Sequence, residues 1–159
     1  MISLIYFQKA SSMTSTTPKY ISSIAIVNDM LHIHEDRINI YKKALHELKD
    51  LEGDEKSLLE AMVEQSLEYK QQLSRLAKED NGEKTELYNV WKAPAVPQSA
   101  GDKKTFAKAC ADDELALANT YALAISMITK DTELEDLLQQ QHKESIDLYN
   151  RFHEFYNAQ

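Results

Sequence analysis

The side chains of this chain that could carry chemistry are a histidine and a glutamate at matching positions of two helical patterns. His34 and Glu114 each lie on an apolar stripe with residues spaced by three and four. Tyr41 follows His34 by seven positions, and Tyr121 follows Glu114 by the same interval. An imidazole facing a carboxylate inside a helical protein can bind iron or manganese, or the two groups can form a buried ion pair. His142, at the edge of another stripe, is a third candidate metal ligand.

A two-metal centre in a helical bundle requires more ligands than these. It takes one glutamate from each of two helices and a Glu-x-x-His pair from each of the other two. Residues 64–67 read Glu-Gln-Ser-Leu and lack the histidine, while residues 139–142 read Gln-Gln-Gln-His and lack the glutamate. A single weak site for iron or manganese built from His34, Glu114 and His142 remains an alternative, and no other cofactor is indicated.

The pattern favours a different role for these positions, a polar layer inside the protein. His34, Ser66, Glu114 and Gln141 all fall at core-facing positions of their stripes. An unpaired buried carboxylate is costly, so Glu114 needs a partner, and His34 is the one we expect. A polar layer of this kind can fix the register of packed helices. We therefore predict a His34–Glu114 pair within a buried polar layer, and no working metal centre.

The elements that must position these residues are helices. Gly and Pro, which most disfavour a helix interior, are rare and leave three long intervals of the sequence clear. The last interval contains a restart signal, because Thr132 is followed three residues later by a glutamate, as in a capping box. One continuous helix over 102–157 is the alternative. The predicted helices span residues 19–51, 54–81, 102–130 and 132–157.

Each predicted helix has one apolar stripe, and four such stripes can be buried only against one another. Short turns near Gly53 and at residues 130–132 make two antiparallel hairpins. The connection over residues 82–101 reaches about 60 Å when extended, more than the ~42 Å of a 28-residue helix. It can therefore cross the length of the bundle, and one long crossover of this kind is the ferritin-like arrangement. Within it, residues 86–91 are expected to form a helical turn whose aromatic side chains cover the bundle surface.

Four stretches of the sequence carry a resemblance to a known family. They are the turn from Leu48 to Gly53, the connection with Trp91, the run from Cys110 to Glu114 followed by Tyr121, and the last helix with His142. These motifs resemble an uncharacterised bacterial family of ferritin-like four-helix proteins, whose members are small domains of unknown function. The resemblance covers about residues 20–157, implies a ferritin-like bundle and brings no established activity.

Composition narrows the class of protein further. The 159 residues include 18 Lys and Arg against 26 Asp and Glu, for a net charge of -8, which argues against a nucleic-acid partner. No apolar run approaches the ~20 residues of a membrane span. Cys110 is the single cysteine, so an internal disulfide is excluded, and we expect a buried thiol rather than a nucleophile. We expect a cytoplasmic protein.

The chain is expected to form one domain over residues 19–159, preceded by a disordered tail over residues 1–18. Met1 and Met13 both remain candidate starts of translation. The complete bundle pattern and the incomplete ligand set predict a non-enzymatic binding or assembly module that forms homodimers. The alternative is a metal-binding protein or a di-metal oxidase of the ferritin type.

Overall fold

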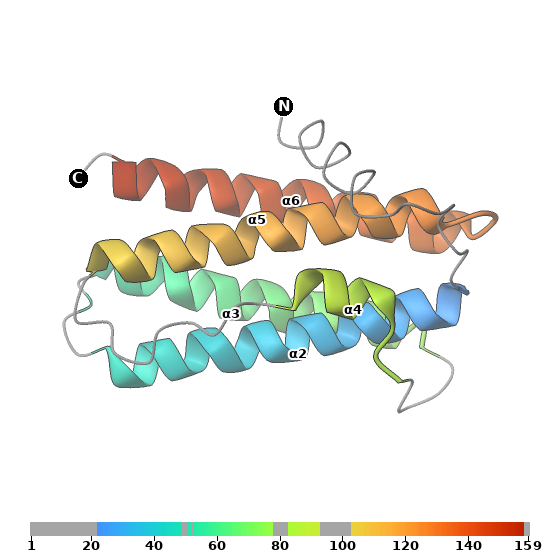
Figure 1. Ribbon diagram of the computed structural model, residues 1–159, viewed down its shortest axis with the longest axis horizontal. Helices are drawn as coiled ribbons and strands as arrows, with labels where there is room; N and C mark the ends of the chain where they lie inside the picture. The colour runs from blue at the N-terminus through green and yellow to red at the C-terminus, as the bar shows by residue number, and fades with distance from the viewer. Residues whose placement is uncertain (1–21, 49–50, 52, 78–82, 93–102, 158–159) are drawn as a thin grey trace.

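The protein is built from helices packed along their length. The computed structural model describes residues 22–48, 51, 53–77, 83–92 and 103–157, with the backbone alone at 103–105 and 156. All regular structure in these ranges is helical, so the predicted all-α class is confirmed for the described residues. The helices are α2 (Ser23–Glu47), α3 (Gly53–Ser74), α4 (Glu86–Trp91), α5 (Lys103–Met127) and α6 (Thr132–Asn157) (Figure 1).

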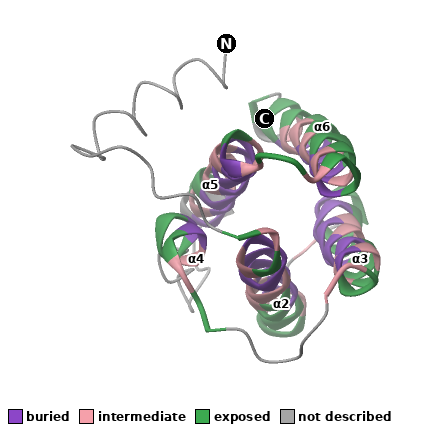
Figure 2. Ribbon diagram, turned by 90° about the vertical axis from the view of Figure 1, so that its right-hand side faces the viewer, coloured by how far each residue is buried: buried purple, intermediate pink, exposed green. Residues whose placement is uncertain are grey.

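The four long helices form two antiparallel hairpins, α2 with α3 and α5 with α6 (Figure 1). Helices α3 and α5 run in the same direction, so the connection between them joins opposite ends of the bundle. Helix α3 also contacts α6, while the short α4 packs against both α2 and α5 (Figure 2). One side of the bundle is therefore widened by α4. The predicted helical turn over residues 86–91 is confirmed, but its buried side chains, Leu87 and Trp91, enter the core instead of covering it.

Three of the long helices end earlier than the sequence predicts. Helix α2 stops at Glu47 because Leu48 is extended, with φ -84° and ψ 101°. Helix α3 stops at Ser74, where the Leu76 N–H turns back to the Leu73 carbonyl at 2.9 Å. The absence of Gly and Pro permits a helix without requiring one, so the predicted ends were too late. Residues 1–21, 49–50, 78–82 and 93–102, which include the predicted tail and much of the long connection, lie outside the described residues.

The alternative of one continuous helix over 102–157 is wrong. Helix α5 ends at Met127, and α6 begins at Thr132. The Asp131 carboxylate accepts a hydrogen bond from the Leu134 N–H at 3.1 Å, which satisfies a donor that the first turn of a helix leaves free. The predicted cap at Thr132 was one residue late, because Thr132 is already the first residue of the helix.

The apolar core consists of two clusters rather than one. The first cluster gathers side chains near the α5–α6 turn and includes both buried residues of α4, Leu87 and Trp91. The second cluster lies toward the other end of the bundle and contains Cys110, Leu148 and Phe152. Buried polar side chains separate the two clusters along each long helix.

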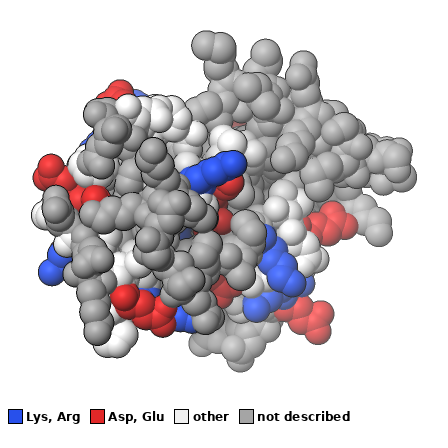
Figure 3. Space-filling view, turned by 60° about the vertical axis from the view of Figure 1, so that its left-hand side comes forward, with Lys and Arg blue, Asp and Glu red and all other residues white. Residues whose placement is uncertain are grey.

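The described surface carries charges of both signs. On the face drawn in Figure 3, acidic and basic side chains are interspersed. Within the described residues, none of the helices combines the length and the apolar character that crossing a membrane requires.

The cap of α6 gives a direct test of the helix boundary. Asp131→Ala should lower the free energy of unfolding by about 1 kcal/mol, because the Leu134 N–H loses its acceptor. In a chain of this size, that change lowers the melting temperature by roughly 2–4 °C. Thr132→Ala is the matched control and should change little. A larger loss with Thr132→Ala, measured by thermal melts, would move the cap back to the position that the sequence predicts.

Candidate functional site

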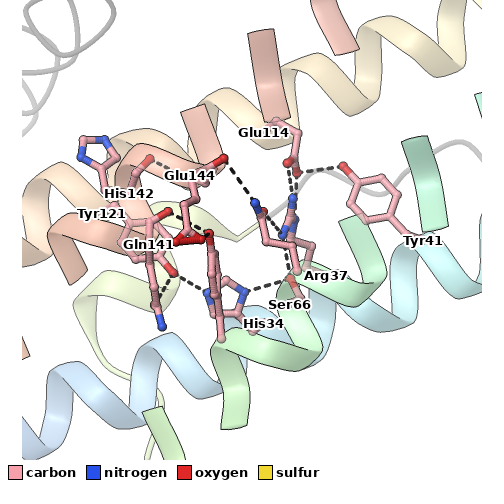
Figure 4. A network of polar contacts seen from close by, with 12 residues as sticks. His34, Arg37, Tyr41, Ser66, Glu114, Tyr121, Gln141, His142 and Glu144 are labelled. Carbon is pink, nitrogen blue, oxygen red and sulfur yellow. Dashed lines mark hydrogen bonds and ion pairs between the residues drawn. The ribbon is translucent and has the colours of Figure 1, made fainter. Parts of the chain in front are cut away.

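The four long helices meet in a layer of buried polar side chains at the middle of the bundle (Figure 4). Each of the six side chains in this layer is at most 2% exposed. The polar residues predicted from the sequence are all buried here, joined by an arginine and a tyrosine that were not predicted as part of it. The polar layer consists of His34 and Arg37 from α2, Ser66 from α3, Glu114 and Tyr121 from α5, and Gln141 from α6.

The charged centre of the polar layer is an ion pair between Arg37 and Glu114. The Arg37 Nε donates to Glu114 Oε2 at 3.0 Å, and the Nη2 donates to the other carboxylate oxygen. Tyr41 adds a third hydrogen bond to Glu114 Oε2 at 2.9 Å. The expected His34–Glu114 pair is therefore wrong. Arginine takes the carboxylate because its planar guanidinium can bind both oxygens at once.

The same guanidinium also ties α2 to α3. Its Nη1 donates to Ser66 Oγ at 2.8 Å and to the Gln65 side-chain oxygen at 2.9 Å. Burial by itself lowers the pKa of Arg37, but the Glu114 carboxylate outweighs this effect and raises the pKa above its ordinary value. Arg37 therefore stays charged, and most hydrogen-bonding groups of the ion pair are satisfied.

His34 lies beside the ion pair and is neutral. Its Nδ1 is 2.9 Å from Ser66 Oγ, and its Nε2 is 2.6 Å from the Tyr121 hydroxyl. Burial, followed by the positive charges of Arg37 and Lys70, holds the pKa of His34 well below its ordinary value. An imidazolium is therefore excluded from this position at neutral pH.

The bond from Tyr121 to Gln141 fixes the direction of the hydrogen bonds that pass through His34. The Tyr121 hydroxyl donates its one hydrogen to Gln141 Oε1 at 2.7 Å, so it can only accept from His34 Nε2, which therefore carries the proton. The unprotonated Nδ1 accepts from the Ser66 hydroxyl. Ser66 also accepts from Arg37, because an oxygen with two lone pairs can accept while it donates. Every donor in this chain has one acceptor, and one tautomer of His34 fits.

The chain of hydrogen bonds continues from the polar layer to the surface. The Gln141 Nε2 donates to Gln72 Oε1 at 2.9 Å, and the Gln72 Nε2 donates to Glu68 Oε1 at 3.4 Å. Side-chain amides hold their protons and do not relay them as hydroxyls and imidazoles do. The arrangement therefore orients side chains and does not conduct protons.

Polar side chains also join α3 to α6 next to the polar layer. Tyr69 donates to the Glu144 carboxylate at 3.2 Å and lies 3.3 Å from the Gln141 carbonyl oxygen. The Gln65 Nε2 donates to the Glu144 carbonyl at 3.3 Å. Burial and then the Glu144 carboxylate raise the pKa of Tyr69, so its hydroxyl stays protonated and available as a donor.

The three candidate metal ligands do not converge on one point. Glu114 is bound to Arg37, and Tyr121 lies between His34 and His142. The half-buried His142 stacks on the Tyr121 ring, with centroids 6.0 Å apart and an angle of 16° between the planes. Burial lowers the pKa of His142. Among the described residues, no group of three or more His, Cys, Asp or Glu side chains could hold a metal ion.

Two further titratable groups lie near the ion pair on α5. Cys110 is fully buried, and burial followed by the Glu114 and Asp113 carboxylates raises the pKa of its thiol. It is therefore a neutral thiol and a poor nucleophile. Asp113 is 4% exposed, and neither carboxylate oxygen has a hydrogen-bond partner in the described structure. Burial, with smaller contributions from Glu114 and Asp112, raises the pKa of Asp113 to about 7.

Sequence reasoning missed several residues of this site. Arg37 is the most important, although it lies three residues after His34 and four before Tyr41, on the same side of the helix. A buried carboxylate such as Glu114 needs a cation nearby, and this requirement could have identified Arg37 from the sequence. The other residues have no comparable signal, because their partners lie on distant segments. They are Gln65, Tyr69, Gln72 and Glu144.

Comparisons of the chain with family models, with curated proteins and with solved structures gave no match.

The ion pair predicts an order of stability among four variants. Arg37→Met should lower the free energy of unfolding by about 3–5 kcal/mol, because Glu114 is left buried without a partner. Adding Glu114→Leu should restore most of that loss, since well-packed apolar side chains replace a buried pair at little cost. His34→Leu removes no charge and should cost about 1–3 kcal/mol. Glu114→Gln keeps the shape but leaves the Arg37 cation buried without its counter-ion, so it should cost about as much as Arg37→Met. Urea unfolding in which His34→Leu is worse than Arg37→Met would contradict this assignment.

Asp113 predicts how stability depends on pH. Its folded pKa of about 7 lies above the unfolded value of ~3.9, so the folded state binds more protons between these values. Ionisation of Asp113 therefore lowers the free energy of unfolding as the pH rises from about 4 to 7. Above pH 7 this unfavourable effect stays constant. Asp113→Asn should raise stability at pH 8 by on the order of 1–3 kcal/mol and change little at pH 4. Melts of both proteins across this range measure the difference, and a difference independent of pH would rule the mechanism out.

Proposed function

We propose that this protein is a ferritin-like four-helix bundle in which a polar layer occupies the position of a metal site. It acts as a non-enzymatic binding or assembly module. The directions of the helices support the architecture, because two antiparallel hairpins are joined by a connection between opposite ends of the bundle. That connectivity is typical of ferritin-like folds.

The observation that carries the proposal is the Arg37–Glu114 pair. Glu114 is the carboxylate at the centre of the bundle, and its two oxygens accept three hydrogen bonds from Arg37 and Tyr41. A guanidinium therefore supplies the positive charge that a metal would supply in a di-iron protein. A metal ion at Glu114 would have to displace Arg37 and leave that cation buried without a partner.

The surroundings of the pair support the same proposal. The groups that surround it are amides and hydroxyls, with His34 held between Ser66 and Tyr121. Carboxylate-bridged metal sites need several glutamates aimed at one point. The donor set of the polar layer fits internal hydrogen bonding and does not fit a pair of iron or manganese ions.

Metal content and size in solution test this proposal together. Protein purified without chelator should contain much less than one equivalent of iron or manganese, and neither ion should raise its melting temperature. The same sample should sediment as a homodimer. One bound equivalent of either metal would instead support the metal-handling or oxidase alternative. A strict monomer would remove self-assembly from the proposal and leave only the binding of another partner.

A further inference from the structure

Asp113 is a buried carboxyl group that the surrounding helices leave without a partner. It is 4% exposed, and both of its oxygens lack a hydrogen-bond donor. In the part of the chain that the structure describes, no lysine or arginine forms an ion pair with it. Asp29 and Glu114, which are buried as deeply, each accept several hydrogen bonds. Asp113 is therefore costly to ionise where it lies, and a proton is the partner that removes this cost.

The groups around Asp113 do not offset the cost of its charge. Burial, followed by the Glu114 and Asp112 carboxylates of the same helix, raises the pKa of Asp113 to about 7. Tyr41 on α2 and Cys110 on α5 also interact with the Asp113 charge, and both are neutral because burial raises the pKa of each. Among the described residues, no group of α4 or α6 is hydrogen-bonded to it. An ionised Asp113 would therefore need water.

The first half of α5 is weakly held in the bundle. It begins with two lysines and has no acidic residue in its first turn, which is unfavourable at the positive end of a helix. Phe106 is its one large apolar side chain before Asp113, and the other buried residues there are Ala107 and Cys110. This half lies in the second apolar cluster, away from α4 (Figure 1). A segment with so few buried apolar contacts can open without unfolding the rest of a protein.

We propose that residues 103–113 form a proton-operated switch, which opens locally when Asp113 releases its proton to water. While the carboxyl is protonated, the segment stays packed in the second apolar cluster. In the open segment the carboxyl ionises at its ordinary value of about 4. Between about pH 4 and 7 each opening therefore releases one proton, so the fraction of open molecules rises about tenfold per pH unit. Above pH 7 that fraction stays constant.

The switch controls access to the second apolar cluster. Cys110 is 0% exposed and lies one turn before Asp113, so the two side chains reach water together when the segment opens. The apolar side chains that this part of α5 covers include Tyr41, Leu148 and Phe152. This inference goes beyond the proposed function, because it concerns how pH regulates the bundle and requires neither a partner nor a metal.

The first measurement uses Cys110 as the reporter, since it is the single cysteine of the chain. Its thiol is labelled with 4,4′-dithiodipyridine at a low concentration, so that the segment closes many times before it reacts. The labelling rate of the unmodified protein, divided by that of Asp113→Asn, should rise about tenfold per pH unit from about pH 5 to 7 and then stay constant. Division of the two rates removes the ionisation of the thiol itself. A ratio that does not change with pH would overturn the switch.

The second measurement separates local opening from global unfolding in the unmodified protein. Local opening exposes little surface, so labelling of Cys110 at pH 7 should change little in urea below the unfolding transition. A labelling rate that rises with urea as steeply as the global unfolding constant would overturn local opening. The dependence of overall stability on Asp113 would remain in that case, and so would the proposed function.

The controls assign the effect to one carboxyl group. Asp112 is the exposed neighbour of Asp113, and Asp112→Asn should keep the rise of the labelling rate with pH. A loss of this rise in Asp112→Asn as complete as in Asp113→Asn would overturn the assignment to Asp113. If Asp113→Asn does not fold, Asp113→Ala takes its place in the ratio. The urea measurement needs no variant and decides the matter if neither folds.

Discussion

The structure depends on the burial of one ion pair, Arg37 with Glu114, at the centre of the bundle. Two charges removed from water are tolerated only when nearly every donor and acceptor around them is matched. The matching groups come from the other helices, so the positions of α2, α3 and α5 are coupled through a few side chains. A shift of one helix by a single turn would separate the charges. The pair therefore selects one packing arrangement among the many that apolar stripes alone would allow.

Much of the fold could be predicted from the sequence, because helical periodicity and the scarcity of Gly and Pro are local properties. The buried positions of Ser66 and Gln141 could be predicted in the same way. The partner of Glu114 was predicted wrongly, since periodicity identifies a face and does not say how far a side chain reaches. Arg37 is long enough to meet a carboxylate on another helix. Asp29 accepts hydrogen bonds at the start of α4 and carries no local signal, because this role exists only when α4 lies beside α2.

Tyr121 links α4 to the polar layer. Its ring belongs to the apolar cluster that contains Trp91, while its hydroxyl accepts from His34 and donates to Gln141. A change in the packing of α4 therefore changes the packing of a ring whose hydroxyl orients the histidine. The two features are neighbours in space, although the residues of α4 lie far from His34 along the chain.

The division of the core has a consequence for how the protein can vary. Substitutions that are far apart and share no partner have additive effects on stability. Leu138 lies in the first apolar cluster and Phe152 in the second, on opposite sides of the polar layer. A substitution that changes the volume of a side chain in one cluster can therefore be compensated by a second substitution in the same cluster, without any change in the other cluster. The polar layer between them has no such freedom, and its members can be exchanged only as a group.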